Sequence, residues 1–177
     1  MIRNYMDCAK SHKGEAGYDD HKLDFIVKNC EVLLTGAPQT FAQALQLLWF
    51  CHTAFWMEDR SAMAFGRMDQ YLYPFYVKDT QAGILTKEQA TELLENVFIK
   101  LPGRDTVNIC IGGMDMQQKC QVNELSYCII DAVRNCNVPG PNLSARMTPD
   151  APDEFWDACL KSIGTGLGYP ALMNDTV

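Results

Sequence analysis

The second half of the chain alternates short apolar runs with amphipathic helical segments, and this alternation restricts the possible folds most strongly. Short apolar runs lie at 107–111, 142–147 and 169–173, and segments with the helical spacing of apolar residues lie between them at 123–136 and 152–163. A strand, helix, strand, helix, strand order is typical of parallel strands joined by crossover helices. The sequence therefore predicts an α/β fold with about three short parallel strands.

Such a sheet is incomplete by itself. Parallel sheets are normally covered on both faces, and the edge strands of any sheet present unpaired backbone groups. The third apolar run is followed by only a few residues, which are too few for another strand and crossover. We therefore expect a mostly helical fragment of a larger α/β structure.

The first half of the chain is predicted to be helical. Periodic apolar residues indicate a helix from 20 to 34, and Thr86 to Gln89 has the form of a capping box that opens a helix up to Lys100. The run 44–56 is apolar on every side, which predicts a helix that is buried on every side. We divide the partial domain 1–177 into a loosely ordered start, 1–19, a helical part, 20–102, and an alternating part, 103–177.

Charge and composition argue against several classes of function. The net charge is −7, with acidic and basic residues interspersed, whereas a nucleic-acid-binding surface needs a basic stripe. No apolar run approaches the roughly 18 to 20 residues of a membrane span. The first residues form no apolar segment of signal-peptide length. We expect a cytoplasmic protein that binds neither nucleic acid nor membrane.

Eight cysteines are scattered along the chain and are expected to be free thiols. Most lie in apolar or helical stretches, where cysteine behaves as a small hydrophobic residue. There is no Cys-x-x-Cys motif, and the neighbours Cys51 and His52 would point to different faces of a helix. The sequence therefore predicts no metal site.

Several separate motifs follow one another in a fixed order. They are the helix 41–55, Gly66-Arg67-Met68-Asp69-Gln70-Tyr71-Leu72-Tyr73-Pro74, Ile111-Gly112-Gly113, Pro141-Asn142-Leu143-Ser144 and Pro170-Ala171-Leu172-Met173-Asn174-Asp175. Together they resemble the glycyl radical enzymes of the pyruvate formate-lyase superfamily. The resemblance extends over residues 20–177.

The resemblance implies a ten-stranded α/β barrel with the active site inside it. In this family a radical S-adenosylmethionine activating enzyme installs a glycyl radical, which generates a thiyl radical on a cysteine of a barrel loop. None of the cysteines here stands in the family's Gly-Cys-Val-Glu or Cys-Cys context, so none is assigned a catalytic role. We expect that the chain itself binds no cofactor and that it needs the missing part of the barrel or self-associates.

Candidate substrate-pocket residues are taken from the positions that match the family's pocket segments, namely Arg60, Ser61, Ala62, Phe65 and Asn174. Many dehydratases of the family carry a His-Ser pair where this chain has Ser61 and Ala62. Small residues there resemble pyruvate formate-lyase itself and suit a compact keto acid. Arg60 could contact a substrate carboxylate with its planar guanidinium, but it could equally pair with Glu58 or Asp59.

Three functions remain open on the sequence alone. The preferred hypothesis is a fragment of a pyruvate formate-lyase-like enzyme, of the formate acetyltransferase type, that is inactive alone. The alternatives are a split subunit or fragment of a glycyl radical dehydratase acting on a diol or polyol, and a non-catalytic interaction module. The first two predict exposed apolar surface where the missing part would pack.

Overall fold

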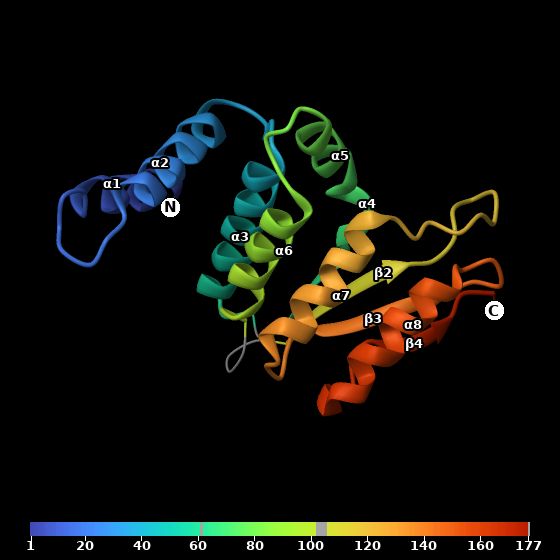
Figure 1. Ribbon diagram of the computed structural model, residues 1–177. Helices are drawn as coiled ribbons and strands as arrows, with labels where there is room; N and C mark the ends of the chain where they lie inside the picture. Colours follow the sequence, from blue (N-terminus) through green and yellow to red (C-terminus); the bar gives the residue numbers. More distant parts are fainter. Residues whose placement is uncertain (61, 102–105, 177) are drawn as a thin grey trace. The chain divides into compact units, whose positions relative to one another are not determined.

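The computed structural model describes residues 1–60, 62–101 and 106–176 (Figure 1). The chain divides into two compact units, Met1–Asp59 and Arg60–Val177. The first unit is helical, and the second combines helices with a parallel sheet. The α/β fold class predicted from the sequence is thus confirmed.

The first unit consists of three helices, α1 (Ile2–Ser11), α2 (Asp20–Thr35) and α3 (Phe41–Met57). The side chain of Asp19 caps α2 by accepting hydrogen bonds from the backbone N–H groups of His21 and Lys22, and Thr40 caps α3 in the same way. All three helices contribute to one apolar cluster, whose buried members are Met6, Ala9, Leu23, Val27, Cys30, Leu33 and Phe50.

Helix α1 is a departure from the sequence analysis, which expected a loosely ordered start. Met6 and Ala9 lie three residues apart and therefore on one face of the helix, where both are buried. This face packs against α2. The polar composition of the first residues concealed the helix, because its support comes from apolar contacts with the following helices.

Helix α3 corrects a second expectation, that of a helix buried on every side. Phe41, Leu45 and Phe50 are buried, but the last turns are not. Phe55 is 47% exposed, and Met57 is 69% exposed. Apolar composition in this helix therefore does not report burial over its whole length.

The second unit is built around a four-stranded parallel sheet with strands in the order β1, β2, β3, β4. Its elements follow one another as β1 (Ala62–Arg67), α4 (Met68–Tyr71), α5 (Tyr73–Gln81), α6 (Lys87–Phe98), β2 (Thr106–Gly112), α7 (Glu124–Cys136), β3 (Asn142–Met147), α8 (Asp153–Ser162), the π-helical turn η1 (Ile163–Leu167) and β4 (Ala171–Asn174). The three predicted strands are present, and β1 is an additional strand inside the segment expected to be helical.

The connections place the helices on one face of the sheet. Each strand lies beside the preceding strand of the sequence, so crossovers of the same hand put every connecting helix on the same side. Accordingly, α6 packs against α7 and α7 packs against α8 (Figure 1). Helix α6 begins with the predicted capping box, in which Thr86 and Gln89 bond to each other's backbone N–H groups.

The two faces of the sheet differ in chemistry. Alternate residues of β2 and β3 are buried on the helix-covered face, namely Val107, Ile109, Ile111, Leu143, Ala145 and Met147. Burying one Val, Leu, Ile or Met side chain stabilises the fold by about 1.5–3 kcal/mol. The opposite face, called the open face below, carries Asn108, Cys110, Asn142, Ser144 and Arg146 on the same two strands.

Strand β1 contains a register shift between Ala64 and Gly66. Before the shift, Ala64 pairs with Asn108; after it, Arg67 pairs with Cys110. Both partners belong to the open face, so Ala64 and Arg67 share this face although they are three residues apart. Phe65, the additional residue, is buried.

Candidate functional site

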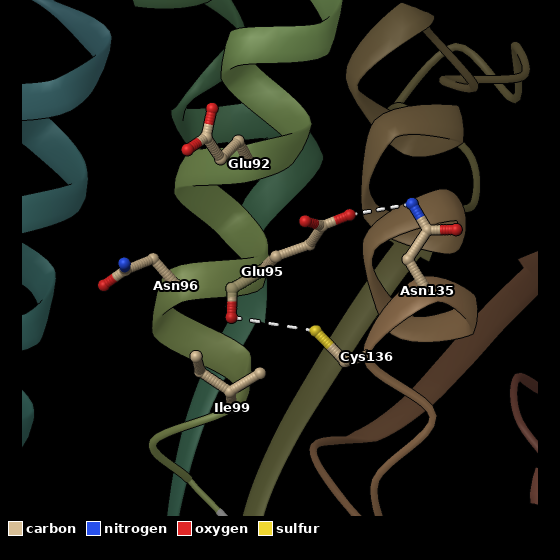
Figure 2. Close-up of a pocket in the computed structure, with 6 residues that line it drawn as sticks. All are labelled: Glu92, Glu95, Asn96, Ile99, Asn135 and Cys136. Carbon is tan, nitrogen blue, oxygen red and sulfur yellow. Dashed lines mark hydrogen bonds between the residues drawn. The ribbon is translucent and has the colours of Figure 1, made fainter.

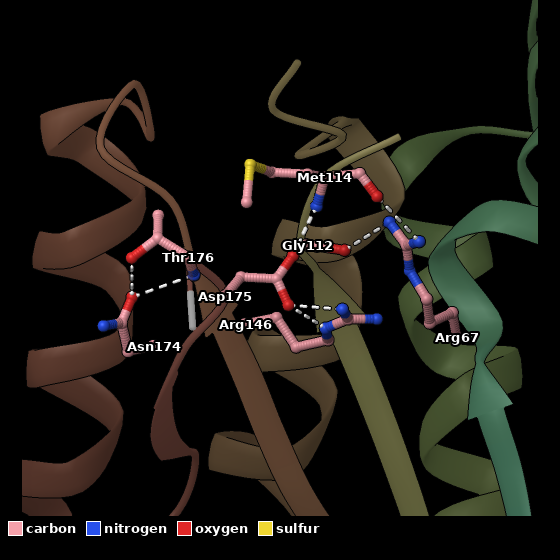
Figure 3. A network of polar contacts seen from close by, with 7 residues as sticks. All are labelled: Arg67, Gly112, Met114, Arg146, Asn174, Asp175 and Thr176. Atoms are coloured by element: carbon pink, nitrogen blue, oxygen red, sulfur yellow. Dashed lines mark hydrogen bonds and ion pairs between the residues drawn. The ribbon is translucent and has the colours of Figure 1, made fainter. Parts of the chain in front are cut away.

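The carboxyl ends of the parallel strands meet at one edge of the sheet, where α/β enzymes commonly place functional groups. Arg67 ends β1, Gly112 ends β2, and Arg146 lies one residue before the end of β3. Asp175 directly follows β4. Figure 3 shows these residues as one network of polar contacts.

Gly112 and Gly113 form the tight turn at the centre of this edge. Both have positive φ, +68° and +84°, which L side chains rarely adopt. A Cβ on Gly113 would lie 3.0 Å from Oδ2 of Asp175 and 3.1 Å from Nε of Arg146. The N–H of Gly113 donates to the carbonyl of Arg146 over 2.8 Å. The turn is therefore specific for glycine, and it brings the ends of β2 and β3 together.

Asp69, in α4, supports the same turn from the interior. Its fully buried carboxylate accepts hydrogen bonds from the N–H of Gly112 at 2.7 Å and from the hydroxyl of Ser126 at 2.6 Å. Burial raises the pKa of Asp69 above its ordinary value, although both hydrogen bonds and the nearby charge of Arg67 oppose this shift.

Arg67 joins the end of β1 to the loop after β2. Its Nη2 donates to the carbonyl of Gly112 over 2.6 Å and its Nη1 to the carbonyl of Met114 over 3.3 Å. The guanidinium is thus engaged by backbone carbonyls. Burial raises the pKa of both the Asp69 carboxyl and the Cys110 thiol, and the nearby charge of Arg67 partly opposes both shifts.

Arg146 and Asp175 form an ion pair across β3 and β4, with both Nε and Nη2 of the guanidinium donating to Oδ1 of the carboxylate. The other carboxylate oxygen accepts from the N–H of Met114 over 2.7 Å. The side chain of Asp175 is 7% exposed, whereas that of Arg146 is 38% exposed. The carboxylate is therefore buried within the network, and the guanidinium reaches solvent.

Towards the amino ends of the strands the open face continues with neutral polar groups. The amide of Asn142 donates to Oδ1 of Asn108 over 3.3 Å and accepts from the hydroxyl of Tyr169 at 2.6 Å. Cys110 and Ser144 pair in register between this ladder and Arg146. Partial burial raises the pKa of the Cys110 thiol, so it is a neutral thiol at pH 7.

The pocket candidates from the sequence do not converge in this unit. Arg60 is exposed and lies before β1, and Ser61 lies outside the described residues. Ala62 is exposed on the open face, where it pairs with Thr106 at the amino end of β2. Asn174 pairs with Met147 at the carboxyl end of β3. Ala62 and Asn174 therefore lie on opposite edge strands and at opposite ends of the sheet.

Two of the candidates, Phe65 and Asn174, do not lie on the open face. Phe65 is 4% exposed at the register shift, and Asn174 shares the helix-covered side with its partner Met147 and accepts hydrogen bonds from Thr176. The sequence motifs include Asp175 beside Asn174 at a strand end, but only Asn174 was taken as a pocket candidate, and Arg146 was not singled out. Both residues could have been identified from their position, because the periodicity that predicts a strand also predicts which side chains lie at its carboxyl end.

Two shallow pockets lie elsewhere in the second unit. One, of ≈ 350 Å³, lies between α6 and α7 and is lined by Glu92, Glu95, Asn96, Ile99, Asn135 and Cys136. Figure 2 shows Glu95 bonded to Asn135 through its carboxylate and to Cys136 through its backbone carbonyl. The other, of ≈ 370 Å³, lies beside β4 and is lined by Met147, Thr148, Pro149, Trp156, Leu172, Met173 and Asn174.

The eight cysteines are free thiols in varied surroundings. Cys8 and Cys51 are exposed, whereas burial raises the pKa of Cys159 to about 12. Within the described residues no group of three or more His, Cys, Asp or Glu side chains could hold a metal ion. In the same part of the chain, no helix has the length and apolar character needed to cross a lipid bilayer.

Comparison with known proteins places these observations in a family. Residues 1–177 match the family described as "Pyruvate formate lyase-like". The chain is 35% identical over 173 residues to "Probable dehydratase YbiW" of Escherichia coli (strain K12), covering 86% of this chain and 21% of that protein. It is 30% identical over 183 residues to "(2S)-3-sulfopropanediol dehydratase" of Klebsiella oxytoca, covering 93% of this chain and 22% of that protein.

The chain is also similar to solved structures of dehydratases. The glycerol-bound form of the B12-independent glycerol dehydratase from Clostridium butyricum superposes with a TM-score of 0.89 and 30% identity, covering 99% of this chain and 24% of that chain. A structure on 1,2-propanediol dehydration in Roseburia inulinivorans superposes with a TM-score of 0.92 and 28% identity, covering 99% and 23%. The chain therefore spans less than a quarter of the length of these four proteins.

Proposed function

Because the chain belongs to the pyruvate formate lyase-like family, whose structural neighbours here are glycyl radical enzymes, we propose that it forms part of a glycyl radical dehydratase acting on a small diol or polyol. The proposal is supported by the functions for which its relatives are named. Relatives at 30–35% identity include dehydratases of a sulfopropanediol and of hydroxyproline, and a decarboxylase of 4-hydroxyphenylacetate also belongs to the set.

The proposal changes the preferred hypothesis of the sequence analysis. Small residues at 61 and 62 favoured pyruvate formate-lyase itself, but the relatives favour the dehydratase alternative. The two hypotheses differ in how much of the sequence supports them. Two pocket positions out of a whole active site discriminate poorly between substrates, whereas identity over more than 160 residues compares most of this chain with its relatives.

The open face supports a hydroxyl-bearing substrate. Amide groups of Asn108 and Asn142, the hydroxyl of Ser144 and the guanidinium of Arg146 offer both donors and acceptors in a row across β2 and β3. A diol can both donate and accept hydrogen bonds, so mixed neutral groups suit it. Resident side chains on this face would orient the substrate and would not carry out the radical step.

The resemblance assigns the hydrogen-atom abstraction to a thiyl radical on a cysteine for which this chain has no matching motif. The chain's share is accordingly to bind and position substrate and to build part of the barrel. The rest of the enzyme would come from further polypeptide or a partner chain, which is consistent with the 21–24% of the relatives' length that the chain covers.

An anaerobic activity assay tests the proposal. The polypeptide encoded by the whole reading frame around these residues is treated with a radical S-adenosylmethionine activating enzyme, and the glycyl radical is quantified by paramagnetic resonance. We expect aldehyde from 1,2-propanediol or glycerol and no formate from pyruvate and coenzyme A. Formate production without aldehyde, at equal radical content, would restore the acetyltransferase hypothesis.

A further inference from the structure

We infer that Arg146 is a substrate-binding residue that donates to a hydroxyl group, and that Asp175 is the positioning residue that holds it and cancels its charge. The inference deepens the proposed dehydratase function and rests on it. It names a substrate class, namely a polyol without a charged group, as the one that this part of the site selects.

The position of Arg146 on the sheet is the first argument. It lies one residue before the carboxyl end of β3 and pairs in register with Gly112 of β2 and Met173 of β4. Its neighbours on the strand, Ala145 and Met147, are buried on the helix-covered side, so Arg146 belongs to the open face. It is therefore a cation at the edge where a parallel α/β sheet presents its ligands.

The unused donors are the second argument. Nε and one Nη2 hydrogen are directed to Asp175, which leaves Nη1 with two N–H donors. Among the described residues, no hydrogen-bond acceptor is recorded for Nη1, and the side chain is 38% exposed. Arg67 is the contrasting case, because both of its Nη groups are used by the carbonyls of Gly112 and Met114.

The fixed geometry is the third argument. A surface arginine has many rotamers, and ordering it costs entropy when a ligand binds. Here Asp175 is anchored by the N–H of Met114, and its own N–H donates to the carbonyl of Met147 over 2.9 Å. Figure 3 shows the carboxylate and the guanidinium pointing toward one another. The donors of Arg146 are thus held in place before substrate arrives.

Charge decides the substrate class. An isolated guanidinium would favour a carboxylate or sulfonate, with which it forms two parallel hydrogen bonds. Asp175 is 7% exposed and occupies that side of the guanidinium with an equal and opposite charge. The pair is neutral, and a second anion would be repelled by the carboxylate. A hydroxyl group, in contrast, can accept from Nη1 without an electrostatic penalty.

Equilibrium binding tests the inference without any radical. The unactivated whole protein is titrated by calorimetry with glycerol, which is neutral, and with glycerate, which carries a carboxylate on a similar skeleton. We expect glycerol to bind more tightly in the wild type. Arg146→Gln should weaken glycerol binding by about tenfold, the effect of losing one hydrogen bond to a charged group.

The Asp175→Asn variant tests whether the charge of Asp175 sets the preference for a neutral ligand. It keeps an acceptor for Arg146 and removes the negative charge, so the ratio of glycerate to glycerol affinity should rise by about tenfold. Arg146→Lys should rescue part of the glycerol affinity, because it retains a cationic donor. Arg134→Gln is the matched control, since Arg134 forms a comparable pair with Asp131 on α7, on the covered side of the sheet.

The outcomes separate this inference from the proposed function. If the activated wild type dehydrates diols but Arg146→Gln binds glycerol as tightly as the wild type, the inference is overturned and the function stands. If no diol is dehydrated and yet glycerol affinity depends on Arg146, the function fails and the binding role stands. A wild type that binds neither compound overturns the inference. Thermal unfolding of each variant identifies any that do not fold.

Discussion

Single residues at the carboxyl edge of the sheet bear several structural demands at once. Gly112 and Gly113 are required for two reasons. Their φ angles are positive, and a Cβ at either position would lie close to neighbouring atoms. Asp69 satisfies two buried donors with one carboxylate. Substitutions at these buried positions should therefore be costly.

Replacing Gly113 by alanine is expected to destabilise the chain and loosen the Arg146–Asp175 pair. The left-handed backbone alone costs about 1–2 kcal/mol for an L residue, and the new Cβ would lie 3.0 Å from the Asp175 carboxylate. Chemical unfolding measures the loss. Gly83→Ala is the control, because Gly83 has φ +68° and no atom within 4 Å of a Cβ. Equal losses for the two variants would argue against the contact.

Replacing Asp69 by alanine should leave two buried donors without an acceptor, the N–H of Gly112 and the hydroxyl of Ser126. Each unsatisfied group costs roughly 1–3 kcal/mol, so we expect the free energy of unfolding to fall by about 2–4 kcal/mol. Equilibrium unfolding in urea measures this change. A loss under 1 kcal/mol would mean that water replaces the carboxylate.

The pH dependence of Asp69 has a definite sign. Its pKa is raised in the folded state, so folding takes up a proton and its stabilising contribution is present at low pH. That contribution should be lost as pH rises from the ordinary Asp value through the raised folded pKa. We expect the unfolding free energy of the wild type relative to Asp69→Asn to decrease over this window. Asp150, whose pKa is lowered by the N–H of Cys120, should show the opposite trend when replaced by asparagine.

At the scale of elements, local signals in the sequence proved most reliable where the chemistry is short-range. The capping box at Thr86 and the periodicity of α6 and α7 are determined within a few residues, and the structure has both. Strand β1 was not predicted because Gly66 and a register shift interrupt its alternation of apolar and polar residues. The strand forms nevertheless, because it pairs with β2. Helix α1 was missed because its support comes from α2.

The cap of α6 can be tested directly. Thr86→Ala removes the acceptor for the N–H of Gln89 and should lower the free energy of unfolding by about 1 kcal/mol. Thr80→Ala serves as the control, because the Thr80 hydroxyl donates to helix carbonyls of Tyr76 and Val77 within α5. That change should stay within about 0.5 kcal/mol. Similar effects at both sites would remove the special role of the cap.

At the scale of the whole molecule, the candidate site could be predicted in its location but not in its residues. Parallel strands place functional groups at their carboxyl ends, and the sequence indicated where strands end. It could not show that Asp175 turns back to Arg146, because that contact spans 29 residues and depends on the turn at Gly113. Asn174 was chosen in its place, one residue away.

Exposed apolar side chains predict association of the 177-residue chain. Leu172 and Met173 on the edge strand β4 are 38% and 50% exposed, and Leu160 on α8 is 54% exposed. Light scattering should show mass increasing with concentration. Met173→Lys should reduce association, since a charge on an edge strand opposes pairing. Met116→Lys, between β2 and α7 and 97% exposed, should not. A monomer at high concentration would refute the prediction.

The extra residue in β1 also affects how this protein is compared with its relatives. Residues 62 and 67 lie on the same side of the sheet despite an odd separation, because Phe65 resets the phase of the strand. In a relative whose strand lacks this extra residue, the side chains before Gly66 would exchange faces: those on the open face here would lie on the helix-covered face, and the reverse. Insertion or loss of one amino acid could therefore exchange the lining of a pocket while every flanking motif stays intact. Substrate range in such enzymes can then diverge by strand phase, without any substitution at the positions usually compared.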